Sequence, residues 1–565
     1  QRQMCIRDRD ILAEQISDDA AIRASLRALY RRTGMLRAVA AKEGESVYAQ
    51  YADYREPVLR AAGHRILAIN RGEREEWLKV AVECDDEQAL QIICRAVIEP
   101  GSACCDVVRA AAKDAWGRLI SPSLEREIRN ELTDKANEGA IRVFGDNLHQ
   151  LLMQPPIRGK VTLGVDPGFR TGCKLAVVDE TGKVLETGVG YFTLPNHEAQ
   201  KPRAKAQILG MIRRHGVTAI AIGNGTASRE SEQFIAALLP EAPGVAYVIV
   251  SEAGASVYSA SKLAAKEFPE YDVSLRSAVS IARRMQDPLA ELVKIDPKAI
   301  GVGQYQHDLK QAELENALSG VVESCVSSVG VDVETASASL LTHVAGIGEA
   351  LANNIVAYRD ENGIASRAQL KKVPKLGPKA FEQCAGFLRV PESANVLDNT
   401  GVHPESYAAA QGLLDLCGYT LADVSAGSLA ALPDKIKALG EESVARQLDI
   451  GVPTLQDVAA ELVKPGRDVR DELPAPILRT DVLDIKDLAP GMVLTGTVRN
   501  VVDFGVFVDI GVHQDGLVHI SQVCNRFIRH PSEIVSVGDV VRVVVLEADE
   551  KKHRISLSMK QVPKE

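Results

Sequence analysis

Hydrophobic and polar residues follow different periods in different parts of the chain. From about residue 10 to residue 152, apolar residues recur at helical spacing, as in Ile92, Ile93, Ala96 and Val97. Turn signals interrupt this pattern and separate successive helices. It predicts a helical N-terminal scaffold over residues 10–155. The opening residues 1–9 (QRQMCIRDR) follow neither period, and we expect an artefactual leader there and a truncated natural N-terminal segment.

After Pro155 and Pro156 the pattern becomes that of an α/β domain over residues 156–285. Three short strands in a meander are predicted first, and alternating helices and strands follow, which indicates a mixed sheet. The predicted strands are 161–165, 173–179, 184–192, 217–222 and 245–250, and the predicted helices include 198–215 and 228–239.

The C-terminal half divides into four further segments. We predict connecting helices over 286–335, two short helix–turn–helix repeats over 336–398, a helical segment with a linker over 399–480, and an all-β module over 488–562. In the last segment apolar and polar residues alternate with period two between glycine turns. The expected fold class is therefore multi-domain and mainly α, with one α/β domain and a C-terminal all-β barrel.

Length and composition bound the function. A chain of 565 residues is too long for a single core, and 46% hydrophobic and 25% charged residues are typical of globular proteins. The formal net charge is −10, so nucleic-acid binding has to come from local basic patches. The ten cysteines show no metal-ligand spacing, and no apolar run is long enough to cross a bilayer. We expect a cytoplasmic protein with no metal, no cofactor and no membrane partner.

The C-terminal module carries the strongest motif. Its pieces are GMVLTGTV from Gly491, VDFGVFVD from Val502, GLVHIS from Gly516, VGDVVRVVV from Val537 and RISLSMK from Arg554. In this order they resemble the S1 domain, which implies a five-stranded OB-fold barrel that binds RNA, preferentially single-stranded.

Two phenylalanines are the candidate stacking residues of this module. Alternation alone places Phe504 and Phe507 on opposite faces, and a bulge at Gly505 would bring both to one surface. The resemblance implies that this surface stacks bases, with His519 beside it. The other interpretation is that both phenylalanines belong to the barrel core. The candidate phosphate-steering residues are Arg499, Arg526 and Arg554.

Each of the two repeats near residue 350 begins with a valine, continues with a short turn that contains glycine, and ends in a helix. VAGIGEALANNI begins at Val344 and VPKLGPKAF begins at Val373, and both resemble the helix-hairpin-helix motif. Glycines allow a tight turn whose backbone N–H groups face a phosphate, a contact that reads no bases. The candidate phosphate-binding residues are Gly346, Gly348, Lys375, Gly377 and Lys379, whereas Glu349 opposes binding. Hairpins that only pack against protein are the alternative.

The α/β domain carries one carboxylate at the end of its first strand. Asp166, followed by PGFRTG, resembles the RNase H-like fold of the Holliday-junction resolvases (the YqgF and RuvC type), whose carboxylates hold two divalent metals. By position, Glu252 and Asp272 would supply further carboxylates, but Asn224 stands where a Glu is expected. We therefore predict a degenerate nuclease fold without catalysis. A nuclease that uses Asp166, Glu252 and Asp272 is the alternative, and a simple strand-end cap at Asp166 is another.

The order of these segments, with LGVDPGFRTGCKLAVVD, GNGTASRE and SEAGASVYSAS in the α/β domain, resembles the Tex family of bacterial transcription accessory proteins over essentially residues 10–560. That family is similar in architecture to the eukaryotic elongation factor Spt-six. The resemblance implies a non-enzymatic, RNA-binding transcription factor with RNA polymerase as a partner and DNA as a second ligand. A ribosome-associated translation factor is a further alternative, because S1 domains also occur there.

Overall fold

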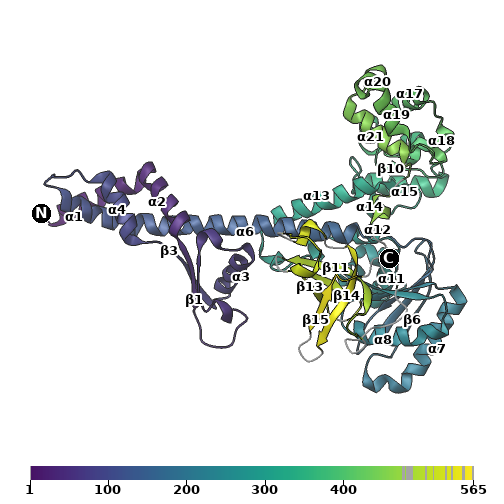
Figure 1. Ribbon diagram of the computed structural model, residues 1–565, viewed down its shortest axis with the longest axis horizontal. Coiled ribbons are helices and arrows are strands. Elements are labelled where there is room, and N and C mark those ends of the chain that lie inside the picture. The colour runs from purple at the N-terminus through teal and green to yellow at the C-terminus, as the bar shows by residue number, and fades with distance from the viewer. Residues whose placement is uncertain are drawn as a thin grey trace. The chain divides into compact units, whose positions relative to one another are not determined.

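The structure is a computed structural model that describes residues 2–466, 468–473, 478, 488–502, 505–512, 514–528, 531–535, 539–549 and 554–562. The chain forms two compact units (Figure 1). The first contains residues 1–147 and 302–318, and the second contains residues 148–301 and 319–565. The described residues include no helix long and apolar enough to cross a membrane.

The first unit is mainly helical. Helices α2 and α6 are joined by side chains four residues apart on each helix: Arg27 pairs with Glu127, and Arg31 pairs with Glu131 at 2.6 Å. Beneath these pairs Leu26, Leu29 and Tyr30 are buried. The helices of this unit are α1 (Arg2–Asp18), α2 (Ala20–Thr33), α3 (Gly63–Arg74), α4 (Asp86–Val97), α5 (Cys105–Asp114) and the first part of α6 (Ser121–Leu152).

One sequence prediction for this unit is wrong: the scaffold is not helical throughout, because it contains a three-stranded sheet of order β2-β1-β3. Helix α1 begins at Arg2, and the artefactual leader expected over residues 1–9 stays a prediction. The strands of the sheet are β1 (Met35–Ala40), β2 (Asp53–Pro57) and β3 (Leu78–Glu83). Each has at most six residues, so its period-two alternation is short beside the longer helical stretches around it.

The second unit begins with the predicted mixed sheet, whose strand order is β6-β5-β4-β7-β8. Strands β6, β5 and β4 are antiparallel, and β4, β7 and β8 are parallel. Helices α7 (Lys201–His215), α8 (Ser228–Leu238), α9 (Ala255–Ser259), α10 (Lys262–Glu267) and α11 (Val273–Gln286) accompany it. The strands are β4 (Thr162–Asp166), β5 (Cys173–Val178), β6 (Val184–Gly190), β7 (Ala219–Gly223) and β8 (Ala246–Val250).

Helix α11 packs directly against the central strand. A Cβ atom added to Gly164 of β4 would lie 2.2 Å from the carbonyl oxygen of Ala278, so only glycine permits this approach. Around it Ala176, Val178, Val279 and Ala282 form a small apolar cluster. This packing brings the first turns of α11 close to the end of β4, where Asp166 lies.

Helical segments continue the second unit, and the first part of one of them, α13 up to Leu318, belongs to the first unit. They are α12 (Pro288–Leu292), α13 (Gln311–Val329), α14 (Ala338–Leu341), α15 (Glu349–Asn362), α16 (Pro378–Cys384), α17 (Tyr407–Cys417), α18 (Leu421–Ser425), α19 (Leu432–Leu439), α20 (Glu441–Gln447) and α21 (Val452–Val463), with the short parallel pair β9 (Val331–Asp332) and β10 (Leu388–Arg389). Helices α17 to α21 enclose a core of their own. Arg367, only 1% exposed, donates hydrogen bonds to the carbonyls of Leu388 and Val402 and so ties the second repeat to the segment that follows it.

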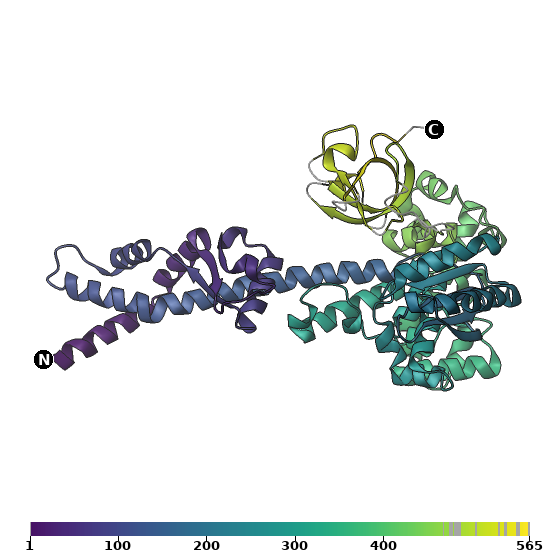
Figure 2. The same ribbon diagram turned by 90° about the horizontal axis from the view of Figure 1, so that it is seen from below.

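The C-terminal module is a closed barrel of strand order β11-β12-β13-β15-β14, and its strands form a ring in Figure 2. Its interior is filled mainly by valine, isoleucine and leucine. The strands are β11 (Val493–Val502), β12 (Gly505–Asp509), β13 (Gly516–His519), β14 (Val540–Asp549) and β15 (Arg554–Ser558). The expected fold class, mainly α with one α/β domain and a five-stranded barrel, is confirmed.

Candidate nucleic-acid interface and carboxylate site

The barrel presents one continuous outer face on the adjacent strands β12, β13 and β15. In β12 the buried Val506 and Val508 alternate with Phe507, which is half-buried and points outward. Phe507 lies opposite Leu517 of β13, and Leu517 lies opposite Ser556 of β15. Because side chains alternate between faces, His519, two positions after Leu517 on β13, and Arg554, two positions before Ser556 on β15, lie on the same face, and both are exposed.

Gly505 shapes this face. It pairs with His519 across the two strands, so His519 is the diagonal neighbour of Phe507. A Cβ atom at Gly505 would lie 2.4 Å from the carbonyl oxygen of Val518, which excludes any larger residue without movement of β13. The side chain of His519 is exposed, and its Nδ1 lies 2.9 Å from Oγ of Ser521.

The expected bulge at Gly505 is not where the sheet is irregular. The β12–β13 register is regular from Gly505 onward, and the shift falls on β11 between Val498 and Asn500. The extra residue is therefore Arg499, which is exposed and donates a hydrogen bond to Asp509 at 2.7 Å. This ion pair reduces the charge that Arg499 offers to a phosphate. Phe504 lies outside the described residues.

Sequence reasoning missed one aromatic residue of this module. Phe527 lies in the loop after the 3-10 helix η13 (Ile520–Gln522), and its side chain is 91% exposed. Its neighbour Arg526, a predicted phosphate-steering residue, is also exposed. The adjacent Arg526 and Phe527 could have indicated a nucleic-acid contact. However, the period-two alternation that predicts exposure in strands does not apply to loop residues.

The two hairpins have matching backbones but different charges. Gly346, in the turn before α15, has φ of 79°, and the equivalent position before α16 is Lys375, with φ of 68°. Gly348 and Gly377 are the N-caps of the two helices. The turns contact each other's helices: Nδ2 of Asn354 donates to the carbonyl of Pro374 at 2.9 Å. The predicted hairpin glycines therefore lie at equivalent positions of a closely packed pair.

Basic side chains gather on the second hairpin alone. Lys371, Lys372, Lys375 and Lys379 are all exposed around its turn. The first hairpin exposes Glu349 at the start of α15, and a surface concavity beside its turn is lined by Glu323 of α13. The second turn therefore carries positive charge and the first carries negative charge, so electrostatics would favour a phosphate contact at the second. Helix α16 has only seven residues, so the lysines contribute more to this attraction than the helix dipole does.

The α/β domain brings two of the three predicted carboxylates together. Asp166 ends β4, and Glu252 follows β8, two strands away in the sheet. The pKa of Asp166 is raised to about 6, mainly by burial and in smaller part by the charge of Glu252, while the hydrogen bond from Ser277 lowers it. Burial also raises the pKa of Glu252. Oδ1 of Asn224, in the position where a Glu was expected, accepts a hydrogen bond from the Glu252 backbone N–H at 3.0 Å.

Asp272 does not join this pair. It is exposed and caps helix α11 by accepting a hydrogen bond from the N–H of Leu275 at 2.8 Å. The residue of α11 that reaches Asp166 is Ser277, which is buried. Its position near the start of the helix suggested that Asp272 would lie beside Asp166. Because α11 packs closely on β4, the residue beside Asp166 is instead Ser277, more than one turn later.

Two positively charged side chains lie near the pair. Lys174 lies opposite Asp166 in the β4–β5 register, is 7% exposed, and lowers the pKa of Asp166. Buried Arg284 lowers the pKa of Glu252 and donates to the carbonyls of Ser251 and Ala253, on either side of it. Divalent cations such as Mg²⁺ and Ca²⁺ bind to several oxygen ligands. Among the residues that the structure describes, no three His, Cys, Asp or Glu side chains are grouped to hold a metal ion.

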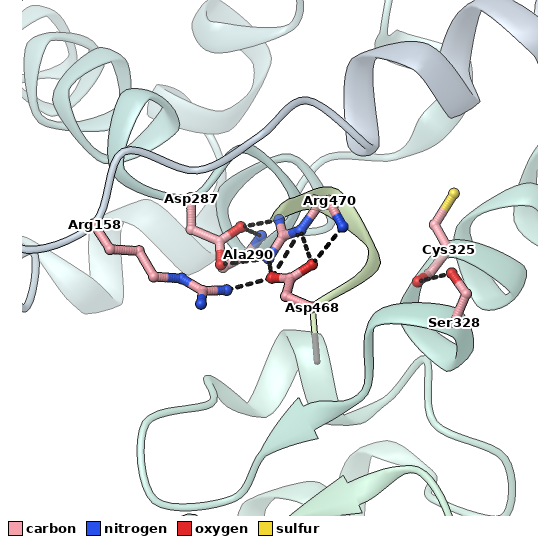
Figure 3. A network of polar contacts seen from close by, with 7 residues as sticks. All are labelled: Arg158, Asp287, Ala290, Cys325, Ser328, Asp468 and Arg470. Carbon is pink, nitrogen blue, oxygen red and sulfur yellow. Dashed lines mark hydrogen bonds and ion pairs between the residues drawn. The ribbon is translucent and has the colours of Figure 1, made fainter. Parts of the chain in front are cut away.

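A buried ion-pair network ties the segment before the S1 module to the end of the α/β domain (Figure 3). Arg470, 1% exposed, donates to Asp287 at 2.7 Å and to Asp468 at 2.8 Å. Arg158 also pairs with Asp468. Burial alone would raise the pKa of Asp468, but its hydrogen bonds and charge interactions with Arg470 and Arg158 hold it below the usual value. Every charge of this network therefore has an opposite partner.

Family models match most of the chain. They are the Tex central region-like model at residues 8–144, the Tex protein YqgF-like domain at 160–286, the helix-hairpin-helix motif at 326–389, the HHH domain at 395–470 and the S1 RNA binding domain at 487–560. The match at 395–470 falls on helices α17 to α21, where the sequence had predicted only a helical segment. Together they define a multi-domain protein that combines a YqgF-like domain with helix-hairpin-helix and S1 modules.

Relatives match across these modules. The chain is 50% identical to the Bacillus subtilis protein YdcI over 97% of its own length and 77% of that protein. It is 46% identical to the transcriptional accessory protein Tex of Neisseria gonorrhoeae, over 98% of its length and 73% of that protein. It is 39% identical to the human S1 RNA-binding domain-containing protein 1, over 88% of its length and 56% of that protein. The chain belongs to the Tex family, which confirms the predicted resemblance.

Proposed function

We propose that this chain is a cytoplasmic transcription accessory factor that binds single-stranded RNA through its S1 barrel. The observation that carries the proposal is the outer face on which Phe507, His519 and Arg554 lie on three adjacent strands. Aromatic side chains stack on bases of any sequence, and basic side chains beside them attract phosphates. The name of the Neisseria gonorrhoeae relative supports the transcriptional role and makes RNA polymerase the expected partner.

The second hairpin supplies a further contact to a nucleic-acid backbone in this proposal. Its exposed lysines attract phosphates without reading bases, so it fits DNA as well as RNA. The chain has a net charge of −10, so this local patch and the barrel face carry the binding. Affinity is then modest and falls with added salt.

The α/β domain serves as a scaffold in this proposal, and not as a nuclease. Ser277 stands where α11 approaches Asp166, and Asp272 is used as a helix cap. Lys174 and Arg284 supply the positive charge that metals supply in an active nuclease. A metal-dependent nuclease built on Asp166 and Glu252 remains the competing function.

The decisive experiment measures binding and cleavage on the same samples. Labelled single-stranded RNA and branched DNA are incubated with the full chain and Mg²⁺ or Mn²⁺, beside the Asp166→Asn variant. We expect RNA to be bound and both substrates to stay intact. Cleavage by the wild type that disappears in D166N would replace our proposal with the nuclease. Co-purification with ribosomes in place of RNA polymerase would replace the transcriptional role with a translational one.

A further inference from the structure

The S1 barrel exposes one phenylalanine side chain almost completely to solvent. Phe527 is 91% exposed, more than any other large apolar side chain in the described part of the chain. Aromatic side chains are usually largely buried in a folded domain, since water solvates them poorly. Single exposed apolar residues are common on surfaces, so exposure alone does not define a function. The surroundings of Phe527 decide what its ring is suited to bind.

Buried residues on both sides of Phe527 anchor its loop to the barrel. Val523 and Ile528 on either side are 3% and 5% exposed, and both belong to the barrel core. Between them, Sγ of Cys524 donates to the carbonyl of Arg526 at 3.2 Å. Because the neighbouring Ile528 anchors the backbone, binding of a ligand to the Phe527 ring needs to restrict only the rotamers of that side chain. The cost in conformational entropy is therefore small.

Charge and position favour a nucleic-acid ligand. Arg526, the residue before Phe527, is also exposed, and residues 520–528 contain no acidic side chain. An aromatic ring with an adjacent guanidinium stacks on a base and attracts the phosphate next to it. The loop also continues from η13, which follows directly after His519 at the end of the proposed stacking face. Phe527 is therefore eight positions after His519 along the chain.

We propose that Phe527 stacks on an additional base of single-stranded RNA and so lengthens the binding site of the barrel beyond the Phe507 face. The inference rests on the proposed function, because it requires that the S1 barrel binds RNA. Phe507 and His519 hold the first bases, Arg526 contacts an intervening phosphate, and Phe527 holds a base further along the strand. Oligonucleotides that are too short to reach the loop bind without it.

The test compares oligouridylates of increasing length on the full chain. Dissociation constants are measured by fluorescence anisotropy for the wild type, Phe527→Ala, Phe527→Tyr, Phe507→Ala and the control Val493→Ala, whose side chain is 38% exposed elsewhere on the barrel. We expect F527A to bind the shortest oligomers normally and long ones about 5- to 20-fold more weakly, the lower range for one lost stack. F527Y keeps a stacking ring and is expected to bind like the wild type.

Different failures point to different errors. If F527A binds every length normally while F507A is weakened, this inference is overturned and the proposed function stands. If neither variant affects RNA binding, the proposed function itself fails. An equal loss in F527A at every length would place Phe527 in the same subsite as Phe507 and remove the extension. Loss of RNA polymerase co-purification in F527A, with RNA affinity unchanged, would make the ring a protein contact and would also overturn the inference.

Discussion

Arg470 donates a hydrogen bond to Asp287 at 2.7 Å although 183 residues separate them in the chain. Asp287 caps helix α12, directly after the α/β domain, and Arg470 lies in the last short helix described before the S1 module (Figure 3). Opposite charges with good hydrogen-bond geometry stay associated even when they are removed from water. The pair therefore fixes the point on the second unit from which the chain continues toward the barrel.

Replacing Arg470 by Met is expected to destabilise this attachment strongly. The change leaves Asp287 and Asp468 without their buried partner, and breaking such a pair costs about 3–5 kcal/mol. Thermal unfolding and hydrogen exchange of residues 468–473 measure the loss. Arg158→Ala is the matched control, because Arg158 is 58% exposed and pairs with the same Asp468, so a cost below about 1 kcal/mol is expected. Equal effects of the two variants would contradict this view of the network.

Phe507→Ala is expected to weaken binding of single-stranded RNA by about 1–3 kcal/mol, because one base loses its stacking partner. The half-buried ring also packs on the barrel, so circular dichroism and the melting temperature must show that the variant folds. Val493→Ala, on the outer surface of β11, is the control that should leave affinity unchanged. Normal affinity in a folded F507A protein would show that the stacking face is misplaced.

Added salt is expected to reduce RNA affinity steeply. Lysine and arginine contacts release counterions from the phosphate backbone, and for single strands the slope of log K against log salt is about −0.7 per contact. The measurement is a series of binding isotherms between 50 and 300 mM KCl. A flat response would mean that stacking alone holds the RNA and that the basic residues near it, Arg526 and Arg554, contribute nothing.

Much of the α/β domain and of the barrel follows from local sequence. The strand predicted at 173–179 is observed as Cys173–Val178, because its apolar run and the turn after it are local signals. The small sheet of the first unit was not predicted, since strands of five or six residues give too few periods to outweigh the surrounding helical pattern. A short strand is identified from sequence when an apolar run and clear turn signals mark it, as at Cys173–Val178, and is missed when a helical pattern surrounds it.

The site was less predictable than the fold because tertiary packing decides which side chains meet. Asp272 lies near the start of α11 and was the third carboxylate of the alternative nuclease, yet it caps the helix while Ser277 reaches Asp166. Likewise, the sequence suggested a bulge at the glycine of β12, but the strand pairing places it at Arg499 of β11. Register and helix packing depend on contacts between distant segments, which one sequence does not display.

Asp166→Asn is expected to stabilise the protein at neutral pH and not at pH 4. Burial raises the pKa of Asp166 from 3.8 to about 6, so the folded state holds the proton more tightly than the unfolded state between these values. The ionised group therefore destabilises the fold above pH 6, by up to about 3 kcal/mol, and this cost disappears as the pH falls toward 4. Melting temperatures of both proteins at pH 7.5 and pH 4 test this. A difference that does not change with pH would contradict the raised pKa.

Lys375→Gly is expected to weaken backbone binding without unfolding the second hairpin. Lys375 has φ of 68°, a left-handed conformation that glycine adopts freely and that the equivalent Gly346 of the first hairpin also has. The substitution removes one charge, while relief of strain offsets the greater freedom of glycine in the unfolded chain, so stability should change by less than about 1 kcal/mol. Affinity for duplex DNA and its salt slope are measured together, and the slope should fall by about 0.9 for one lost phosphate contact. Glu349→Gln on the first hairpin is the control: it removes a negative charge that opposes phosphate, so it should lower neither the affinity nor the slope. If E349Q weakens binding and K375G does not, the first hairpin, and not the second, contacts the nucleic acid.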